Sequence, residues 1–255
     1  MQVARDIGRT RSMHLTRRIL LAAPAILAAA PAWPTEPLDI LAYDLRPLSA
    51  PPTADGRHGI VLDVVAAAVR RIGREPRFTF VIFPEAVERA RTVPGTLVAP
   101  LGRVPSREDA FTWVARVLDV PQAMGTLAGR PAVDLAAARG LARIGVIRGG
   151  LQEAFLRENG LTNLVILETG RDLAVALAEG RLDAWYSTAP EIALQFEAIG
   201  RQGGATVGPT LQVAPAWLAA HLDARDMPVA GLRAAMDALH ADGTVERIYR
   251  SYVGG

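Results

Sequence analysis

The chain has 255 residues, 28 of them basic and 26 acidic, and it contains neither lysine nor cysteine. Half of the residues are hydrophobic, which excludes a disordered chain. The lack of cysteine excludes disulfides and metal sites with cysteine ligands. The length fits one large domain or two domains of about 100 residues each.

Residues 13–32 have the pattern of an export signal. Two arginines precede an apolar stretch over 19–30, which is shorter than the roughly 20 residues of a membrane-spanning helix. The Ala-Pro-Ala sequence at 30–32 fits the rule for signal peptidase, so we expect cleavage after it. We expect translation to start at Met13, which makes 1–12 an extension, and either the Sec or the twin-arginine route fits.

The basic character of the chain belongs to this leader. Removing the five arginines and one aspartate of residues 1–32 from the 28 basic and 26 acidic residues leaves 23 and 25, a net charge of −2. The mature chain then has no general electrostatic reason to bind nucleic acid. We expect a monomeric periplasmic protein with no nucleic-acid partner and, after cleavage, no membrane insertion.

Hydrophobic periodicity predicts strands and helices that alternate along the mature chain. Over 60–72 the apolar residues recur at helical spacing, and a glycine follows at 73. In chain order we predict strand 38–42, helix 60–72, strand 78–83, helix 85–92, strand 97–101, a polar loop over 103–109, extended segments 111–120 and 124–127, helix 133–138, strand 144–147, helix 151–158, strand 164–167, helix 171–178, a turn and strand over 180–186, helix 190–199, extended segment 210–218, and helices 229–239 and 244–252. This alternation indicates the α/β class.

Local catalytic and metal-binding motifs are missing from the sequence. The four histidines are far apart, and none belongs to an HExxH motif. No GxSxG, Walker or GxGxxG motif occurs. We therefore expect no metal and no cofactor, and the chain reads as a binding protein rather than an enzyme.

Five short motifs follow one another in the mature chain. They are DGRHGIVLD at 55–63, RVPSRE at 103–108, FTWV at 111–114, GRLDA at 180–184, and ALHADGT with a later Ile-Tyr at 238–249. In this order, behind an export signal, they resemble the periplasmic solute-binding proteins of ABC importers, in the polar amino-acid class (solute-binding family 3). The resemblance covers nearly all of 38–255, although Val104 stands where that family usually has threonine.

The resemblance implies a bilobal periplasmic-binding-protein fold of type II, with two α/β lobes joined by two crossing segments. Lobe one would comprise 33–120 and 214–255, and lobe two would comprise 121–213. A ligand held in the cleft would favour lobe closure because it contacts both lobes. An ABC permease would then recognise the closed form.

Two arginines of the 103–108 motif are candidate ligand-binding residues. The resemblance implies that Arg107 grips the carboxylate of the ligand, which a planar guanidinium can do with two hydrogen bonds. The alternative is a solvated arginine paired with Glu108 or Asp109. Arg103 would add positive charge to the same loop, or else lies on the surface.

The turn at Gly149, Gly150 and Leu151 is a second candidate. Glycines before a helix present backbone N–H groups to an anion. The family often has threonine or serine at the position of Leu151, so one hydroxyl contact is lost here. The alternative is a plain strand-to-helix turn.

Three positions depart from the family pattern around the ligand. Thr188 stands where its amino-acid binders usually carry the aspartate that pairs with the α-ammonium group, and Arg46 stands where an aromatic residue is usual. Tyr43 would replace that aromatic residue, or else it is a half-buried strand tyrosine. Strand alternation directs only one of Trp185 and Tyr186 into the cleft, and Tyr186 is the candidate ligand contact.

The leading hypothesis is a soluble periplasmic protein that binds a small carboxylate-bearing solute for an ABC importer. Because Thr188 carries no charge, we expect a ligand that is not an ordinary α-amino acid, or one whose ammonium group is recognised weakly. The first alternative is a periplasmic dehydratase-like enzyme for prephenate-like acids, with Glu85, Glu88 and Asp44 as the nearest acid or base candidates. The second is a sensor protein without a permease.

Overall fold

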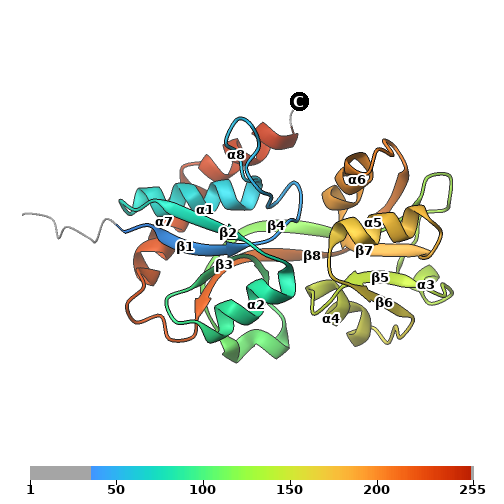
Figure 1. Cartoon of the computed structure of the whole chain (residues 1–255), viewed down its shortest axis with the longest axis horizontal. Coiled ribbons are helices and arrows are strands. Elements are labelled where there is room, and N and C mark those ends of the chain that lie inside the picture. Colours follow the sequence, from blue (N-terminus) through green and yellow to red (C-terminus); the bar gives the residue numbers. More distant parts are fainter. Residues whose placement is uncertain (1–35, 254–255) are drawn as a thin grey trace, which may run out of the picture. The chain divides into compact units, whose positions relative to one another are not determined.

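The computed structural model describes residues 36–253, in which strands and helices alternate (Figure 1). In chain order the elements are β1 (Leu38–Ala42), α1 (Ile60–Arg71), β2 (Pro76–Phe80), α2 (Phe83–Thr92), β3 (Leu97–Gly102), a 3₁₀ turn (Pro105–Ala110), β4 (Phe111–Leu127), α3 (Leu135–Ala138), β5 (Ile144–Ile147), α4 (Leu151–Glu158), β6 (Leu164–Leu167), α5 (Gly170–Ala178), β7 (Ala184–Thr188), α6 (Ala189–Ala198), β8 (Ala205–His221), α7 (Val229–Ala241) and α8 (Thr244–Val253). The predicted α/β class is confirmed. The predicted leader lies outside the described residues, and no helix within them is long and apolar enough to cross a membrane.

One sheet contains all eight strands, in the order β2-β1-β3-β8-β4-β7-β5-β6. The strands β1, β2 and β3 run parallel to one another at one end, and β5, β6 and β7 do so at the other. Between them lie β4 and β8, two strands of 17 residues each that pair antiparallel. This long pair is therefore the connection between the two parallel parts of the sheet.

The interruption predicted at 121–123 is wrong, because β4 continues through it. Pro121 pairs with Val213 of β8, and the register shifts at Gln122 and Ala123. Proline fits an extended backbone but donates no ladder hydrogen bond, so it is tolerated beside such irregularities. Long-range pairing with β8 thus keeps a segment extended that local sequence marks as a break.

The loop after β1 is held in place by α1 and α8. Gly59 has a φ of 99°, and a side chain there would lie 2.7 Å from the carbonyl carbon of Leu48, so only glycine fits. Asp63 in the first turn of α1 accepts hydrogen bonds from the His58 N–H at 3.1 Å and from the Tyr252 hydroxyl at 2.5 Å. These contacts hold the end of this loop against α1 and α8.

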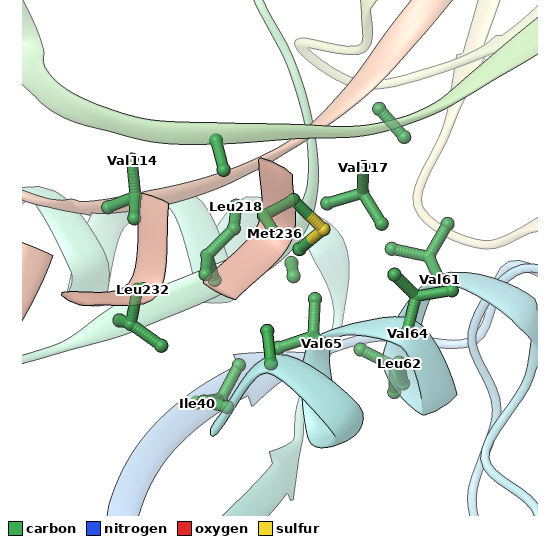
Figure 2. Close-up of a cluster of buried hydrophobic side chains, with 14 of the residues drawn as sticks. Ile40, Val61, Leu62, Val64, Val65, Val114, Val117, Leu218, Leu232 and Met236 are labelled. Atoms are coloured by element: carbon green, nitrogen blue, oxygen red, sulfur yellow. The ribbon is translucent and has the colours of Figure 1, made fainter. Parts of the chain in front are cut away.

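The largest hydrophobic cluster lies between α1, α7 and the sheet. Figure 2 shows Met236 of α7 between valines of α1 and of β4. The buried residues labelled there are Ile40, Val61, Leu62, Val64, Val65, Val114, Val117, Leu218, Leu232 and Met236. Burying each of these side chains contributes about 1.5–3 kcal/mol, so this cluster accounts for much of the stability of the first part of the sheet.

Two other clusters cover the two faces of β7. One contains Met124, Ile144, Leu156 and Tyr186. The other contains residues of α5 and α6 together with Trp185. A strand covered on both faces is typical of a parallel sheet with helices on each side.

Candidate functional site

Two cavities adjoin each other where the loop after β1, the end of β3 and the starts of α2, α4 and α6 meet. The smaller cavity has a volume of about 50 Å³ and the larger one about 250 Å³. Both are lined by Tyr43, Leu45, Phe83 and Ile147. The smaller cavity is also lined by Leu48, Pro100, Leu101, Gly102, Val120, Gln122, Gly150, Leu151, Gln152, Ser187, Thr188, Ala214, Pro215 and Ala216. The larger one is also lined by Asp44, Val81, Ile82, Glu168, Thr169, Gly170, Arg171, Glu191 and Gln195.

The polar side chains of the smaller cavity are all neutral. Gln152 of α4 donates a hydrogen bond to Gln122 of β4 at 2.8 Å, and Gln122 donates to the Val120 carbonyl at 3.1 Å. Both amides are buried, so this pair ties the start of α4 to the long strand β4. No sequence pattern predicts this pair, because the two glutamines are 30 residues apart.

Arg107 is buried, with only 8% of its surface exposed. Its guanidinium donates to the carbonyl of Gly102 at 3.1 Å and to the carbonyl of Gly149. It also lies 5.3 Å from the ring centroid of Phe83. Burial lowers the pKa of Arg107, and no carboxylate among residues 36–253 forms an ion pair with it. The side chain does not line either cavity, but three residues that it contacts or adjoins, Gly102, Phe83 and Gly150, do.

The turn before α4 only partly matches an anion-binding site. Gly149 has a φ of 65°, but its N–H donates to the carboxylate of Glu153 at 2.8 Å. The N–H of Gly150 donates to the Ile147 carbonyl at 3.0 Å. Both N–H groups that we predicted for an anion therefore already have partners, and the N–H groups that remain are those of the first turn, which begins at Leu151.

Thr188 is the N-cap of α6 rather than a free cavity group. Its hydroxyl accepts a hydrogen bond from the Glu191 N–H at 3.2 Å, and the residue is buried at the wall of the smaller cavity. Thr188 itself carries no charge, but the sequence analysis did not consider the carboxyl group of Glu191, three residues later.

Glu191 is the functional candidate that sequence reasoning missed. It is 1% exposed and lines the larger cavity, and one carboxyl oxygen accepts a hydrogen bond from Ser187. Burial raises the pKa of Glu191 to about 8; the Ser187 hydrogen bond opposes the shift and Asp44 adds to it. The Thr-x-x-Glu spacing from Thr188 is a capping-box pattern, which indicates a helix start but not a buried carboxyl group.

Tyr43 lies between the two cavities. Its hydroxyl donates to the Pro100 carbonyl at 2.8 Å, and its ring packs edge-on against Phe83 with 4.7 Å between centroids. Burial raises the pKa of Tyr43, with Arg107 lowering it and Glu191 raising it further. Phe83 was predicted as the end of a strand, but it begins α2, which turns its ring toward both cavities.

Arg103 and Arg46 lie outside both cavities. Arg103 pairs with Glu108 and lies over the rings of Trp113 and Trp217, 5.2 and 5.0 Å from their centroids. Arg46 pairs with Asp44 at 3.1 Å. Both guanidinium groups are satisfied by neighbours close in sequence, so the structure does not bring them to the site.

Neither Trp185 nor Tyr186 lines either of these two cavities. Both are fully buried, Tyr186 against Phe155 on one face of β7 and Trp185 among α5 and α6 on the other. The prediction that one of them faces the cleft assumed that one face of β7 is open. Helices cover both faces, and the next residues, Ser187 and Thr188, reach the smaller cavity instead.

The two cavities offer hydrogen bonds and charge rather than metal ligands. Within residues 36–253 no group of three or more histidine, aspartate or glutamate side chains could hold a metal ion. Glu191 of the larger cavity can give or accept a proton, and Tyr43 and Phe83 supply an apolar wall to both cavities. Arg107 can bind an anion, but it lies behind the cavity walls, beside Gly102 and Phe83. The arrangement suits a small polar solute.

Comparison with known proteins rests on structure, since no protein-family model and no curated protein matches the sequence. A substrate-binding protein of an amino-acid ABC transporter from Streptococcus pneumoniae, bound to L-arginine, has a TM-score of 0.71 at 15% identity and covers 84% of this chain and 94% of its own. A histidine kinase sensor domain with similarity to periplasmic binding proteins has a TM-score of 0.74 at 17% identity, covering 86% and 96%.

A third similar structure is an ancestral amino-acid-binding protein described as a precursor of cyclohexadienyl dehydratase. Its TM-score is 0.70 at 16% identity, and the match covers 84% of this chain and 94% of that one. Identities this low establish the fold and not the ligand. The chain therefore has the bilobal periplasmic-binding-protein fold that the sequence motifs predict.

Proposed function

We propose that the chain is an exported solute-binding protein of the family 3 type, which captures a small carboxylate-bearing solute between two lobes. Lobe one comprises 33–120 and 214–255, and lobe two comprises 121–213. In this proposal the protein is a periplasmic monomer that hands its solute to an ABC permease. The fold supports solute capture. A kinase sensor domain and a transporter's binding protein both have this fold, so delivery to a permease is proposed separately from solute capture.

The observation that carries the proposal is the position of Arg107. Its buried guanidinium donates to Gly102 at the end of β3 and to Gly149 before α4, so it bridges segments that belong to different lobes. A guanidinium has five N–H donors, and a carboxylate satisfies two of them together better than carbonyl oxygens do. A solute carboxylate would therefore replace the Gly149 carbonyl as a partner of Arg107.

Arg107→Ala tests this assignment. Hydrogen bonds to charged groups contribute about 1.5–3 kcal/mol, so we expect the affinity for carboxylate solutes to fall by about tenfold or more. The measurement is a thermal-shift panel of small carboxylates, with and without amino groups, followed by calorimetric titration of each hit. The control is Arg130→Ala, which removes an exposed arginine elsewhere on the chain. Unchanged affinity in Arg107→Ala would contradict the assignment.

The panel also tests the expectation about Thr188. Its hydroxyl cannot pair with an α-ammonium group as a carboxylate would, and it is already used as a helix cap. We expect standard α-amino acids to stabilise the protein less than other carboxylates of similar size. Strong stabilisation by α-amino acids alone would overturn that expectation.

An enzyme on the same fold is the second candidate, and Glu191 favours it. Glu85 and Glu88 are exposed and paired with Arg89 and Arg91, so they fit an acid or base role poorly. Glu191 is buried at a cavity wall and stays largely protonated at neutral pH, as an acid that assists the loss of a hydroxyl group would. Consumption of prephenate by the purified protein, abolished in Glu191→Gln, would favour this candidate over pure binding.

A further inference from the structure

Ile82 is an exposed apolar residue at a position where helices usually carry a capping side chain. It is the N-cap of α2, makes no side-chain hydrogen bond to the first turn, and has 46% of its surface exposed. Serine, threonine, aspartate and asparagine are preferred at such positions because they accept a hydrogen bond there. The helices α5 and α6, which border the same cavity, do have threonine caps. Neither capping nor core packing therefore accounts for an isoleucine at position 82.

Ile82 extends an apolar wall in the larger cavity. The other apolar residues that line this cavity are Tyr43, Leu45, Val81, Phe83 and Ile147. Three of them pack against the buried cluster that contains Phe83, so the wall is continuous with the protein interior. Single apolar residues are common on protein surfaces, but one that adjoins five others in a cavity indicates a binding surface for an apolar group.

The charged residues of the larger cavity do not make this wall a site for a second charge. Asp44 and Glu168 each form an ion pair with an arginine outside the cavity, at 3.1 and 2.6 Å. Glu191 largely keeps its proton at neutral pH, because burial raises its pKa to about 8, and its Oε1 is packed against Gly170 rather than open to the cavity. Arg171 is exposed to solvent. An uncharged apolar group fits this wall better than a second charged group, which would lose water here.

Phe83 connects this wall to the candidate carboxylate site. Its ring centroid lies 5.3 Å from the guanidinium carbon of Arg107 and 4.7 Å from the ring centroid of Tyr43. Both aromatic residues line the larger cavity. A solute whose carboxylate binds Arg107 would therefore direct its chain past these rings into the larger cavity.

We propose that the larger cavity binds the apolar tail of the solute, so that the ligand class is an aliphatic or aryl monocarboxylate. The inference rests on the proposed function, in which Arg107 holds the carboxylate. The cavity has a volume of about 250 Å³. An apolar cavity of roughly 150 Å³ in another protein holds benzene. A phenyl ring or a chain of several methylene groups therefore fits.

The test is calorimetric titration at pH 7 with straight-chain monocarboxylates from propanoate to heptanoate. Burial of one methylene group corresponds to about a fourfold gain in affinity, so we expect an increase of this size per methylene until the tail fills the cavity. For the same reason 3-phenylpropanoate should bind at least about tenfold more tightly than propanoate.

Acids with a second charged end test the apolar character of the cavity. Adipate and 6-aminohexanoate have the chain length of hexanoate but carry a carboxylate or an ammonium group at the far end. We expect both to bind at least about tenfold more weakly than hexanoate, because the second charge loses water without gaining a buried partner.

The variant Ile82→Ser should change binding and stability in opposite directions. Serine removes apolar surface and supplies the missing cap, so we expect about a fivefold loss of hexanoate affinity with a melting temperature equal to or above that of wild type. Propanoate should bind as it does to wild type. Val93→Ser is the matched control, since Val93 ends the same helix, is 47% exposed and lines neither cavity. It should leave the affinity for hexanoate unchanged.

The outcomes separate this inference from the proposed function. An affinity that does not rise with chain length, equal binding of hexanoate and adipate, or unchanged hexanoate affinity in Ile82→Ser overturns the apolar site and leaves Arg107 as the carboxylate partner. Binding of hexan-1-ol that weakens in Ile82→Ser, together with no binding of any acid, supports the apolar site and counts against the carboxylate proposal. If neither the acids nor the alcohol binds, the apolar site is wrong.

Discussion

A single buried carboxyl group makes the stability of this protein depend on pH. In the unfolded chain Glu191 has an ordinary pKa near 4.5, whereas in the folded protein burial raises it to about 8. Between these values the folded state binds more protons than the unfolded state, so the free energy of unfolding falls as pH rises from about 4.5 to 8. The stabilising contribution of the protonated form is therefore complete at low pH and lost above pH 8.

Because the free energy of unfolding falls with rising pH through Glu191, the variant Glu191→Gln should lose this part of the pH dependence. Chemical denaturation at pH 5, 7 and 9 should show a difference between variant and wild type that grows with pH, reaching about 3–5 kcal/mol in favour of the variant. Other titrating groups contribute equally to both proteins, so the difference isolates Glu191. A difference that stays constant across this range would mean that the carboxyl group titrates normally.

The local sequence around Glu191 shows what short patterns can and cannot indicate. Ser187-Thr188-x-x-Glu191 predicts a helix start, and α6 does begin at Ala189 with Thr188 as its cap. In a regular capping box the glutamate bonds back to the N-cap backbone. Here the glutamate accepts a hydrogen bond from Ser187 instead, packs against Gly170 of α5 and lines a cavity together with the loop after β1. Short sequence patterns do not predict this proximity to distant segments.

At the scale of single elements, the caps of α5 and α6 position the wall of the larger cavity. The hydroxyl of Thr169 accepts a hydrogen bond from the Asp172 N–H at 3.1 Å, in the same way that Thr188 caps α6. Each helix begins directly after a cap residue with an extended backbone, Thr169 for α5 and Thr188 for α6. Local sequence therefore decides where α5 and α6 begin, and with that it sets the positions of Gly170 and Glu191 in their first turns.

Thr169→Ala should lower the free energy of unfolding by about 1 kcal/mol, because one N–H group of the first turn of α5 loses its acceptor. Thr92→Ala is the matched control, since its hydroxyl only donates to the Glu88 carbonyl, 2.8 Å away, at the end of α2. We expect the control to stay within about 0.5 kcal/mol of wild type. Urea denaturation of both variants measures the difference, and equal losses would show that the cap itself contributes nothing.

At the scale of the whole molecule, a close contact joins the end of β3 to the start of α4. A methyl group at Gly102 would lie 2.6 Å from Cδ2 of Leu151 and 2.9 Å from its Cβ. Together with the hydrogen bond from Arg107 to Gly149, this contact holds segments from the two proposed lobes against each other. A glycine at 102 is thus required by the approach of another segment, not by its own backbone conformation.

Gly102→Val should push these segments apart. We expect small-angle X-ray scattering of the purified variant to give a larger radius of gyration than wild type, because the added methyl groups cannot fit beside Leu151. Adding Leu151→Gly should bring the radius of gyration back toward the wild-type value, because it removes both Cδ2 and Cβ of the colliding side chain. Circular dichroism confirms that both variants are folded. Identical scattering from all three proteins would show that the contact does not govern lobe approach.

The sequence alone determined the class, the order of nearly all elements and the fold. Hydrophobic periodicity and turn residues act over short distances, so 38–42, 144–147, 151–158 and 164–167 match β1, β5, α4 and β6. The family motifs also indicated Arg107 and the turn at Gly149 as separate ligand-binding candidates, and the structure brings the two into contact. What those residues face depends on the assembled structure, in which Tyr186 is buried, the N–H of Gly149 donates to Glu153, and Glu191 is enclosed. Burial and partner choice depend on segments far apart in the chain, and these segments meet only when the sheet is assembled.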